Sequence, residues 1–259
     1  MTAPDQTPTA RVALVTGGNR NIGRDTALAL AADGIDVVVT YRERAQQAAD
    51  VVAEIEALGR RATAIGVDLT GTGQLDHLEA ELDEVLTGWG ADGLDVLVNN
   101  AGTLRLGTFE SITEDDLDAV FDTNYKSVFF LTQRLAPKLR DGGRIVNLGS
   151  GTAGIAFGPL VSYGPLKAAL QSLTRYLAAH LGPRGITVNA VAPGGLDDDF
   201  NATLFDEVFP PAREFIRSNT ALGRIGMPDD VGGVIAFLAS PAASFITGAV
   251  LPIDGGYHL

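Results

Sequence analysis

The sequence predicts a doubly wound α/β fold, in which helices cover both faces of a mostly parallel β-sheet of about seven strands. Three observations lead to this prediction. Short β-branched runs alternate with Ala/Leu-rich segments of helical spacing along the whole chain. Several runs are apolar throughout and stop at glycine, which is typical of strands covered on both faces. No Pro/Ser-rich linker interrupts the alternation, so we expect one domain at residues 11–259 behind a flexible tail at residues 1–10.

The first half of the chain contains four expected strands, each a short apolar run. The run at 11–16 stops at Gly17-Gly18, and the Ala/Leu-rich segment at 22–33 keeps helical spacing until Gly34. The same alternation then predicts, in order, a strand at 37–39, a helix at 45–58, a strand at 62–67, a helix at 75–86 and a strand at 94–98.

The second half continues the alternation with longer helices. The elements expected are a helix at 114–139, a strand at 144–148, a helix at 162–181, a strand at 186–191, a helix at 231–239 and a strand at 251–253. Thr113, with Asp116 three residues later, is an N-cap signal for the first of these. Pro165 is tolerated only in a first helical turn, so the helix at 162–181 should begin near Ser162. Residues 194–226 are the least regular and are expected to form a mobile lid.

The composition excludes several classes of function. The chain carries 19 Lys and Arg against 32 Asp and Glu, a net charge of −13 at pH 7. This balance argues against non-specific binding to nucleic acid and to anionic membranes. The absence of cysteine excludes disulfides and thiolate sites, and His77, His180 and His258 are too scattered for a histidine metal site. We expect no metal, no nucleic acid and no membrane partner.

Two segments bear on location. Residues 1–10 lack the basic and apolar stretches of a secretory signal, so a cytoplasmic protein is expected. Residues 231–253 carry no charge and are long enough for a membrane helix. Pro241 and Pro252 break that run, so a buried helix, a turn and a buried strand are the preferred interpretation.

A glycine-rich loop follows the first expected strand. Residues 16–23 read Thr-Gly-Gly-Asn-Arg-Asn-Ile-Gly and lead into the first helix. Such a loop lets the backbone approach a pyrophosphate at a helix N-terminus. A β–α turn can also use glycine only for its left-handed backbone, so the loop alone leaves both interpretations open.

Tyr163 and Lys167 form the strongest catalytic pattern. They are four residues apart, so they share one face of a helix and can reach a common ligand. A free phenol titrates near pH 10, and a nearby ammonium stabilises the phenolate and lowers that pKa. Ser150 ends the fifth strand, where its hydroxyl could bind a substrate oxygen. Taken singly, these residues could equally be a surface pair and a turn residue.

Together these motifs resemble the pattern of short-chain dehydrogenases/reductases. The matching pieces are Thr16-Gly17, Asn99-Asn-Ala-Gly102, Asn124, Ser150, Tyr163-Gly-Pro-Leu-Lys167 and Asn189-Ala-Val-Ala-Pro-Gly194, in the family's order and spacing over about residues 11–258. The resemblance implies a Rossmann-like fold and a carbonyl–alcohol oxidoreductase similar to 3-oxoacyl-carrier-protein reductases. Asn21 stands at the family's middle glycine, and asparagine tolerates the left-handed geometry this position needs.

The resemblance also assigns roles to individual residues. Tyr163 would be the general acid/base, and Lys167 together with the positive charge of the oxidised nicotinamide would lower its pKa. Ser150 would orient the substrate oxygen, and Asn124 would position a water in a proton relay. The residues expected to bind the cofactor, besides Tyr163 and Lys167, are Gly17, Asn19, Arg20, Asn21, Ile22, Gly23, Tyr41, Arg42, Asp68, Leu69, Asn100, Ala101, Gly102, Pro193, Gly194 and Leu196. Asp198 stands where the family often has a threonine that holds the carboxamide, which puts that contact in doubt.

The end of the second strand indicates which nicotinamide is preferred. In folds of this kind an acid there selects NAD, whereas arginine accepts the extra phosphate of NADP. The position is Tyr41, Arg42 follows it, and Glu43 is the nearest acid. The resemblance puts Arg20 beside the same phosphate. We expect NADP(H) to be preferred over NAD(H).

The substrate and the alternatives stay open. A carrier-bound acyl chain, a steroid-like ring and a small sugar or ketone are all compatible with the sequence. Phe157, Phe200, Phe205 and Phe209 suggest either an apolar pocket or anchors for the lid. A lyase or dehalogenase on the same fold would be expected to lose the phosphate loop, and a cofactor sensor to lose Tyr163 or Lys167.

The resemblance implies a homo-oligomer, a tetramer or a dimer, that packs the helices at 114–139 and 162–181. Gly164, Ala168 and Ala169 form a small-residue face that would permit close approach of two helices, although burial within one chain would explain it as well.

Overall fold

The computed structural model describes residues 10–257 and 259, and its centre is one sheet of seven parallel strands. The strand order is β3-β2-β1-β4-β5-β6-β7. The strands are β1 Val12–Val15, β2 Asp36–Tyr41, β3 Ala62–Gly66, β4 Leu94–Asn99, β5 Leu139–Leu148, β6 Thr187–Pro193 and β7 Val250–Ile253. The chain reverses its direction of travel across the sheet between β1 and β4. A ligand crevice is expected at that point, beyond the carboxyl ends of the strands.

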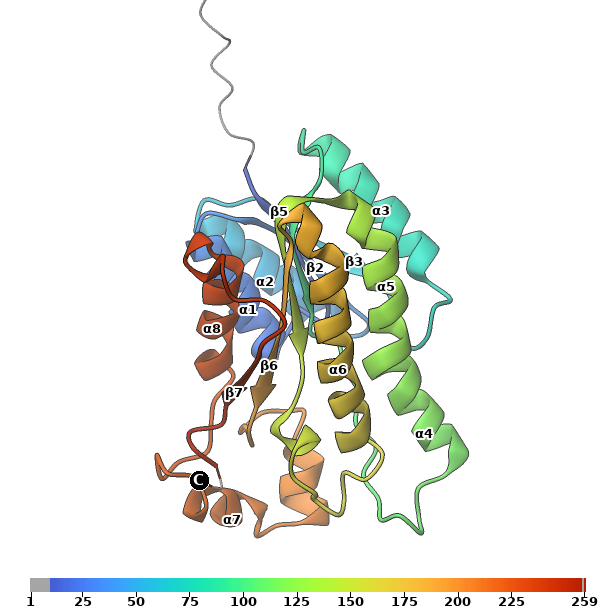
Figure 1. Ribbon diagram of the computed structural model, residues 1–259, viewed down its shortest axis with the longest axis vertical. Helices are drawn as coiled ribbons and strands as arrows, with labels where there is room; N and C mark the ends of the chain where they lie inside the picture. Colours follow the sequence, from blue (N-terminus) through green and yellow to red (C-terminus); the bar gives the residue numbers. More distant parts are fainter. Residues whose placement is uncertain (1–9, 258) are drawn as a thin grey trace, which may run out of the picture.

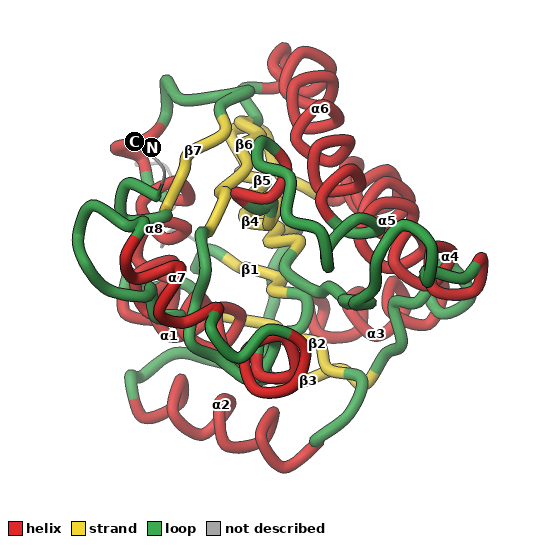
Figure 2. Tube along the Cα trace, turned by 90° about the horizontal axis from the view of Figure 1, so that it is seen from below, coloured by secondary structure: helices red, strands yellow, loops and turns green. Residues whose placement is uncertain are grey.

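Helices cover both faces of the sheet, as expected from the sequence (Figures 1 and 2). On one face lie α1 Asn21–Ala32, α2 Ala45–Ala57 and α8 Asp229–Ala239. On the other lie α3 Leu75–Gly88, α5 Ser127–Leu135 and α6 Gly164–Leu181. Two apolar clusters fill the spaces between layers, one around Leu30 and Ile235 and one around Leu82 and Leu135. The predicted fold class is confirmed.

The region expected to be helical at 114–139 is helical from 114 to 138, although its geometry is not α-helical throughout. The structure has α4 Glu114–Phe121, a π-helical turn Asp122–Lys126, α5, and a 3₁₀ turn Ala136–Lys138. The expected cap is present, because Thr113 and Asp116 form a reciprocal capping box. The π turn coincides with Asn124, whose side-chain amide donates to the carbonyl of Val120 at 2.9 Å and competes with the helical ladder there.

Three other boundaries follow from local chemistry. β5 begins five residues before the expected strand, because Leu139 pairs with Leu94 across an irregular register. The helix α6 begins at Gly164, with Pro165 in its first turn, as the proline required. The uncharged run at 231–253 divides into α8, a 3₁₀ turn Pro241–Ala243 and β7. Among the described residues no helix is long and apolar enough to cross a membrane.

Residues 194–226 are more ordered in secondary structure than expected. They contain a π-helical turn Leu204–Val208 and α7 Ala212–Ser218. This segment lies at the end of the molecule from which Figure 2 is viewed, beyond the ends of the strands. Phe205 is only 1% exposed and packs with Leu204 and Ala212. The mobility of the segment stays a prediction, and the tail predicted at residues 1–10 lies almost wholly outside the described residues.

Candidate active site

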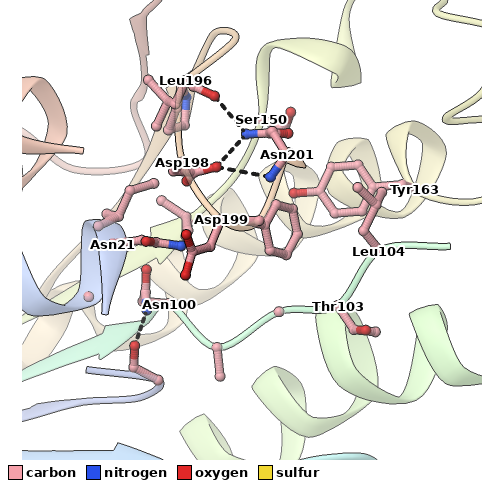
Figure 3. A pocket seen from close by; sticks show the side chains of 18 of the residues that line it. Asn21, Asn100, Thr103, Leu104, Ser150, Tyr163, Leu196, Asp198, Asp199 and Asn201 are labelled. Atoms are coloured by element: carbon pink, nitrogen blue, oxygen red, sulfur yellow. Dashed lines mark hydrogen bonds between the residues drawn. The ribbon is translucent and has the colours of Figure 1, made fainter. Parts of the chain in front are cut away.

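An open pocket of about 480 Å³ lies at the carboxyl ends of the strands. Its walls come from the β1–α1 loop, the ends of β2 to β6, and residues 194–226. Every site residue predicted from the sequence lines this pocket except Asn124, which is fully buried behind its wall. Figure 3 shows Asn21 and Asn100 toward one end and Tyr163 toward the other.

The glycine-rich loop is tied to the neighbouring strands by backbone and side-chain hydrogen bonds. The amide of Gly17 donates to the Thr40 hydroxyl at 3.1 Å, and that of Gly18 donates to the Thr40 carbonyl at 2.9 Å. Gly17 and Asn21 have φ values of 61° and 49°, so asparagine does adopt the left-handed geometry expected of it. A Cβ on Gly23 would collide with the carbonyl oxygen of Gly17.

Thr16 and Asn100 join this loop to the end of β4. The Thr16 hydroxyl accepts from the amides of Asn100 and Ala101 at 2.9 and 3.0 Å. In return the Asn100 side-chain amide donates to the carbonyls of Thr16 and Gly17 at 2.8 and 3.0 Å, as Figure 3 shows in part. The two loops are thus held in one fixed relation beside the N-terminus of α1.

The residues predicted around an adenosine sit at the neighbouring strand ends. Asp68 follows β3, and its carboxylate accepts from the amide of Thr70 at 2.8 Å. Leu69 is 6% exposed and Tyr41 is half-buried at the end of β2. All three line the pocket.

Arginines gather at the same end, and one of them was missed by the sequence analysis. Arg20 Nη1 and Arg44 Nη1 lie 3.7 and 3.0 Å from the same oxygen, Asp199 Oδ2. Arg42, which was predicted, instead pairs with Glu43 at 3.2 Å. Arg44 has a left-handed backbone (φ 62°), and no sequence signal predicts that conformation at an arginine.

Asn124 is held by two hydrogen bonds in the π turn. Its amide donates to the carbonyls of Thr103 and Val120 at 2.8 and 2.9 Å. Its Oδ1 is buried and has no hydrogen-bond partner among the residues that the structure describes. A buried acceptor of this kind usually bonds to a water or a ligand. A Cβ on Gly102 would lie 2.8 Å from that oxygen, so any larger residue at this position would crowd it.

Ser150 and Thr152 form a pair of hydroxyls after β5. Their oxygens are 2.8 Å apart, and Ser150 Oγ also accepts from the Thr152 amide at 3.2 Å. These bonds orient the Ser150 hydroxyl, which lies near the Tyr163 end of the pocket in Figure 3. Thr152 was not predicted, because a threonine in a turn carries no distinctive signal.

Tyr163 and Lys167 are both buried, at 8% and 2% exposure. Lys167 Nζ donates to the carbonyl of Leu148 at 2.7 Å and lies 5.4 Å from the centre of the Tyr163 ring. Burial lowers the pKa of Lys167 to about 7. Burial first, and then the charge of Asp198, raises the pKa of Tyr163 above that of a free phenol. The lowering of the Tyr163 pKa that we expect from the lysine together with an oxidised nicotinamide stays a prediction.

Asp198 faces the same space as Tyr163. Its carboxylate accepts from the backbone amide and the side chain of Asn201 at 3.0 and 2.9 Å (Figure 3). Asn201 also donates to the Leu196 carbonyl at 3.1 Å. Burial raises the pKa of Asp198. A carboxyl group held in this way can accept a hydrogen bond from an amide NH₂, whereas a threonine hydroxyl could either donate or accept.

The three consecutive aspartates point to separate partners. Asp197 pairs with Arg213 at 3.1 Å, Asp198 binds Asn201, and Asp199 faces Arg20 and Arg44. Among the described residues no group of three or more His, Asp or Glu side chains could hold a metal ion.

The pocket has the features that a nicotinamide dinucleotide needs. The glycine-rich loop brings its backbone and the N-terminus of α1 to the pocket. Arg20 and Arg44 provide a position for an anion, and the buried Asn124 Oδ1 faces the loop at Gly102. Beyond them Pro193, Gly194 and Leu196 line the pocket between β6 and the lid segment. The residues present therefore fit such a cofactor along the length of the pocket.

Comparisons with known proteins agree with this geometry. The family model described as enoyl-(acyl carrier protein) reductase matches residues 17–258. A hydroxynaphthalene reductase-like protein Arp2 of Metarhizium brunneum is 39% identical over 269 residues, with 99% of each chain covered. The 3-oxoacyl-[acyl-carrier-protein] reductase FabG of Staphylococcus aureus is 38% identical over 249 residues, covering 95% of this chain and 98% of the relative.

A solved structure of a related protein has the same fold as this chain. A short-chain dehydrogenase from Burkholderia cenocepacia J2315, solved in complex with NADP, has a TM-score of 0.86 and 44% sequence identity. The match covers 95% of this chain and 97% of the other. The likeness therefore extends over nearly the whole of both proteins.

Proposed function

This chain belongs to the short-chain dehydrogenase/reductase family, as its sequence motifs predicted, and on that basis we propose that it is an NADP(H)-dependent oxidoreductase interconverting a carbonyl and a secondary alcohol. The observation that carries the proposal is the convergence of Tyr163, Lys167 and Ser150 at one end of the pocket whose other end is the glycine-rich loop. A bound nicotinamide would supply or accept the hydride.

Tyr163 is the proton donor when the carbonyl is reduced. Its raised pKa keeps the phenol protonated at neutral pH, which is the form that donation requires. The Ser150 hydroxyl, oriented by Thr152, binds the same substrate oxygen and stabilises its developing negative charge. In the reverse direction Tyr163 accepts the alcohol proton, and a nearby positive charge makes the phenolate easier to form.

Lys167 and Asn124 support the proton transfer. A pKa of about 7 lets Lys167 gain or lose a proton near neutrality, and its bond to the Leu148 carbonyl fixes the amine beneath Tyr163. The buried Asn124 Oδ1 would hold a water that carries protons between Lys167 and solvent.

The arginines favour NADP(H) over NAD(H). Two guanidinium groups, from Arg20 and Arg44, already converge on one anionic oxygen, and Arg42 is adjacent in sequence. A charge-assisted hydrogen bond to a phosphate is worth roughly 1.5–3 kcal/mol. The position of a discriminating acid is occupied by Tyr41. The NADP bound to the Burkholderia relative supports the same preference.

Two assays test the proposal. Tyr163→Phe should abolish NADPH oxidation at 340 nm with a ketone panel, while NADPH affinity measured by fluorescence titration stays within about twofold, because the loop is untouched. Retained turnover would remove Tyr163 from its role. Wild-type kcat/KM should be higher with NADPH than with NADH, and an equal or higher value with NADH would refute the preference.

We expect the chain to form a homo-oligomer through the outer face of α4, α5 and α6. Phe129, Phe130 and Tyr176 are 37, 38 and 75% exposed on this face. Gly164 does not contribute, because it packs internally against the carbonyl of Thr152. Sedimentation should give a mass of two or four chains, and a mass of one chain would rule the oligomer out.

A further inference from the structure

The Tyr163 end of the pocket differs in chemistry from the cofactor end. Half-buried or buried apolar side chains line it from three segments that are distant in sequence. They are Leu104, Phe157, Phe200, Leu204, Phe205 and Ile216. The Phe200 ring packs near that of Tyr163, with ring centroids 6.2 Å apart and planes tilted by 51°. A carbonyl held at the Tyr163 hydroxyl would therefore have an aromatic side chain beside it.

The positive charges that line the pocket are also distributed unevenly between its two ends. Among the pocket-lining residues the arginines are Arg20, Arg42 and Arg44, all at the cofactor end. Lys167 is the other cation in the lining, and it is buried beneath Tyr163. Asp198 and Asp254 also line the pocket, and their carboxylates would repel an anionic group.

Two arginines near the substrate space form ion pairs with carboxylates outside the pocket. Arg213 lies over the outer side of the Phe205 ring at 4.9 Å and pairs with Asp197 and Asp206. Arg105 bonds to Thr103 and lies 3.7 Å from Asp116. Neither lines the pocket. A phosphate or carboxylate held close to the reacting carbonyl would thus gain no cation at this end.

We infer that the substrate is an uncharged, bulky aromatic or fused-ring ketone, not a phosphate-bearing acyl thioester and not a small hydrophilic ketone or sugar. The phenyl rings supply the edges and faces against which a planar ring packs at 4.5–7 Å. A small polar ketone would leave most of these apolar side chains uncovered. The inference rests on the proposed oxidoreductase activity and specifies which carbonyl compounds that activity takes.

A three-substrate comparison with NADPH tests the inference. The probes are 2-tetralone, which is uncharged and bicyclic, acetoacetyl-CoA, which carries phosphates, and dihydroxyacetone, which is small and polar. We expect kcat/KM for 2-tetralone to exceed each of the others by at least about tenfold, because acetoacetyl-CoA brings uncompensated charge and dihydroxyacetone lacks the aromatic packing contact. An equal or higher value for either competitor overturns the inference but leaves the proposed function intact. Absence of turnover with all three overturns the proposed function.

A variant pair connects the selectivity to the aromatic wall. Phe200→Ala should raise KM for 2-tetralone about tenfold and reduce its advantage over dihydroxyacetone, because a ring contact beside the reacting carbonyl is lost. Phe245→Ala removes a fully exposed ring that does not line the pocket and serves as the matched control. Unchanged selectivity in Phe200→Ala, with NADPH affinity retained, would overturn the assignment of the wall.

Discussion

The two ends of the pocket are built in different ways. The cofactor end is made of backbone, where glycine turns and the Thr16–Asn100 bonds fix two loops against buried strands. The substrate end is made of side chains, mostly from residues 194–226 and the turn after β5. A backbone cradle depends on a few residues that no other type can replace, whereas an apolar wall depends on shape and tolerates substitution. Small substitutions at the cofactor end should therefore cause large losses of binding, whereas similar substitutions at the substrate end should change the kinetics only gradually.

The largest effect is expected from Gly23→Ala at the cofactor end. The new methyl group would collide with the Gly17 carbonyl and lie 2.6 Å from the Asn100 side chain, which carries two hydrogen bonds. We expect a loss of about 3 kcal/mol in unfolding free energy, and a loss of about 100-fold in NADPH affinity. Urea unfolding and fluorescence titration measure the two effects.

Gly233→Ala is the control for Gly23→Ala. Gly233 lies within α8, where a Cβ would meet nothing within 4 Å. Because alanine is the better helix former, we expect a gain of about 0.5–1 kcal/mol and unchanged NADPH binding. Equal behaviour of the two variants would show that the cofactor end is not a tight backbone cradle.

Lys167 lies at the boundary between the two ends, and its burial has a measurable cost. Because its pKa is lowered to about 7 in the folded protein, the unfolded chain binds more protons between pH 7 and the ordinary lysine value. Its destabilising contribution is thus complete below pH 7 and diminishes as the pH rises. Lys167→Met should abolish activity, yet raise the unfolding free energy at pH 6 by about 2 kcal/mol.

The pH dependence separates this effect from simple repacking. The stability advantage of Lys167→Met should be smaller at pH 9 than at pH 6 by about 1 kcal/mol or more. Lys126→Met is the control, because that ammonium is partly exposed and pairs with Asp122 at 3.0 Å. Chemical unfolding at both pH values gives the comparison, and a constant advantage would mean that the Lys167 ammonium is not buried at a cost.

The comparison also explains what could be predicted from the sequence. Strands β1, β2 and β4 could be predicted because each contains a continuous apolar run, and Asn21 was correctly expected to be left-handed. The pair Tyr163 and Lys167, for which we propose a catalytic role, could be singled out because the four-residue spacing is itself the signal. These features are local in sequence, as a backbone cradle and a helix face must be.

Other features depended on contacts between distant residues. Arg44 reaches Asp199, 155 residues away, only because its own backbone is left-handed. The π turn follows from a side-chain bond of Asn124 to Val120, which leaves no periodicity in the sequence. The burial of Tyr163, which raises the pKa of its phenol, depends on the fold and leaves no local signal in the sequence. The phenylalanines were noted, but their common wall required the fold.

The arginines provide the next largest effect and sharpen the description of the cofactor end. Arg44→Ala should weaken NADPH binding about tenfold and leave NADH binding within about twofold, since one charge-assisted bond to a phosphate is lost. Arg42→Ala should have the smaller effect, because Arg42 pairs with Glu43. Titrations of both cofactors measure this difference. Equal losses for NADPH and NADH would exclude Arg44 from phosphate recognition.

The smallest effect is expected from Phe209→Leu at the substrate end. Phe209 supports the wall from behind, with its ring 5.9 Å from Phe157 and 6.3 Å from Phe215. Leucine keeps most of the apolar burial but loses the edge-to-face geometry, which is worth about 0.5–1.5 kcal/mol. We expect KM for 2-tetralone to rise about two- to threefold as Phe157 shifts, with NADPH affinity unchanged. Steady-state kinetics and titration give both values, and an equal loss of NADPH affinity would mean that the two ends are one coupled structure.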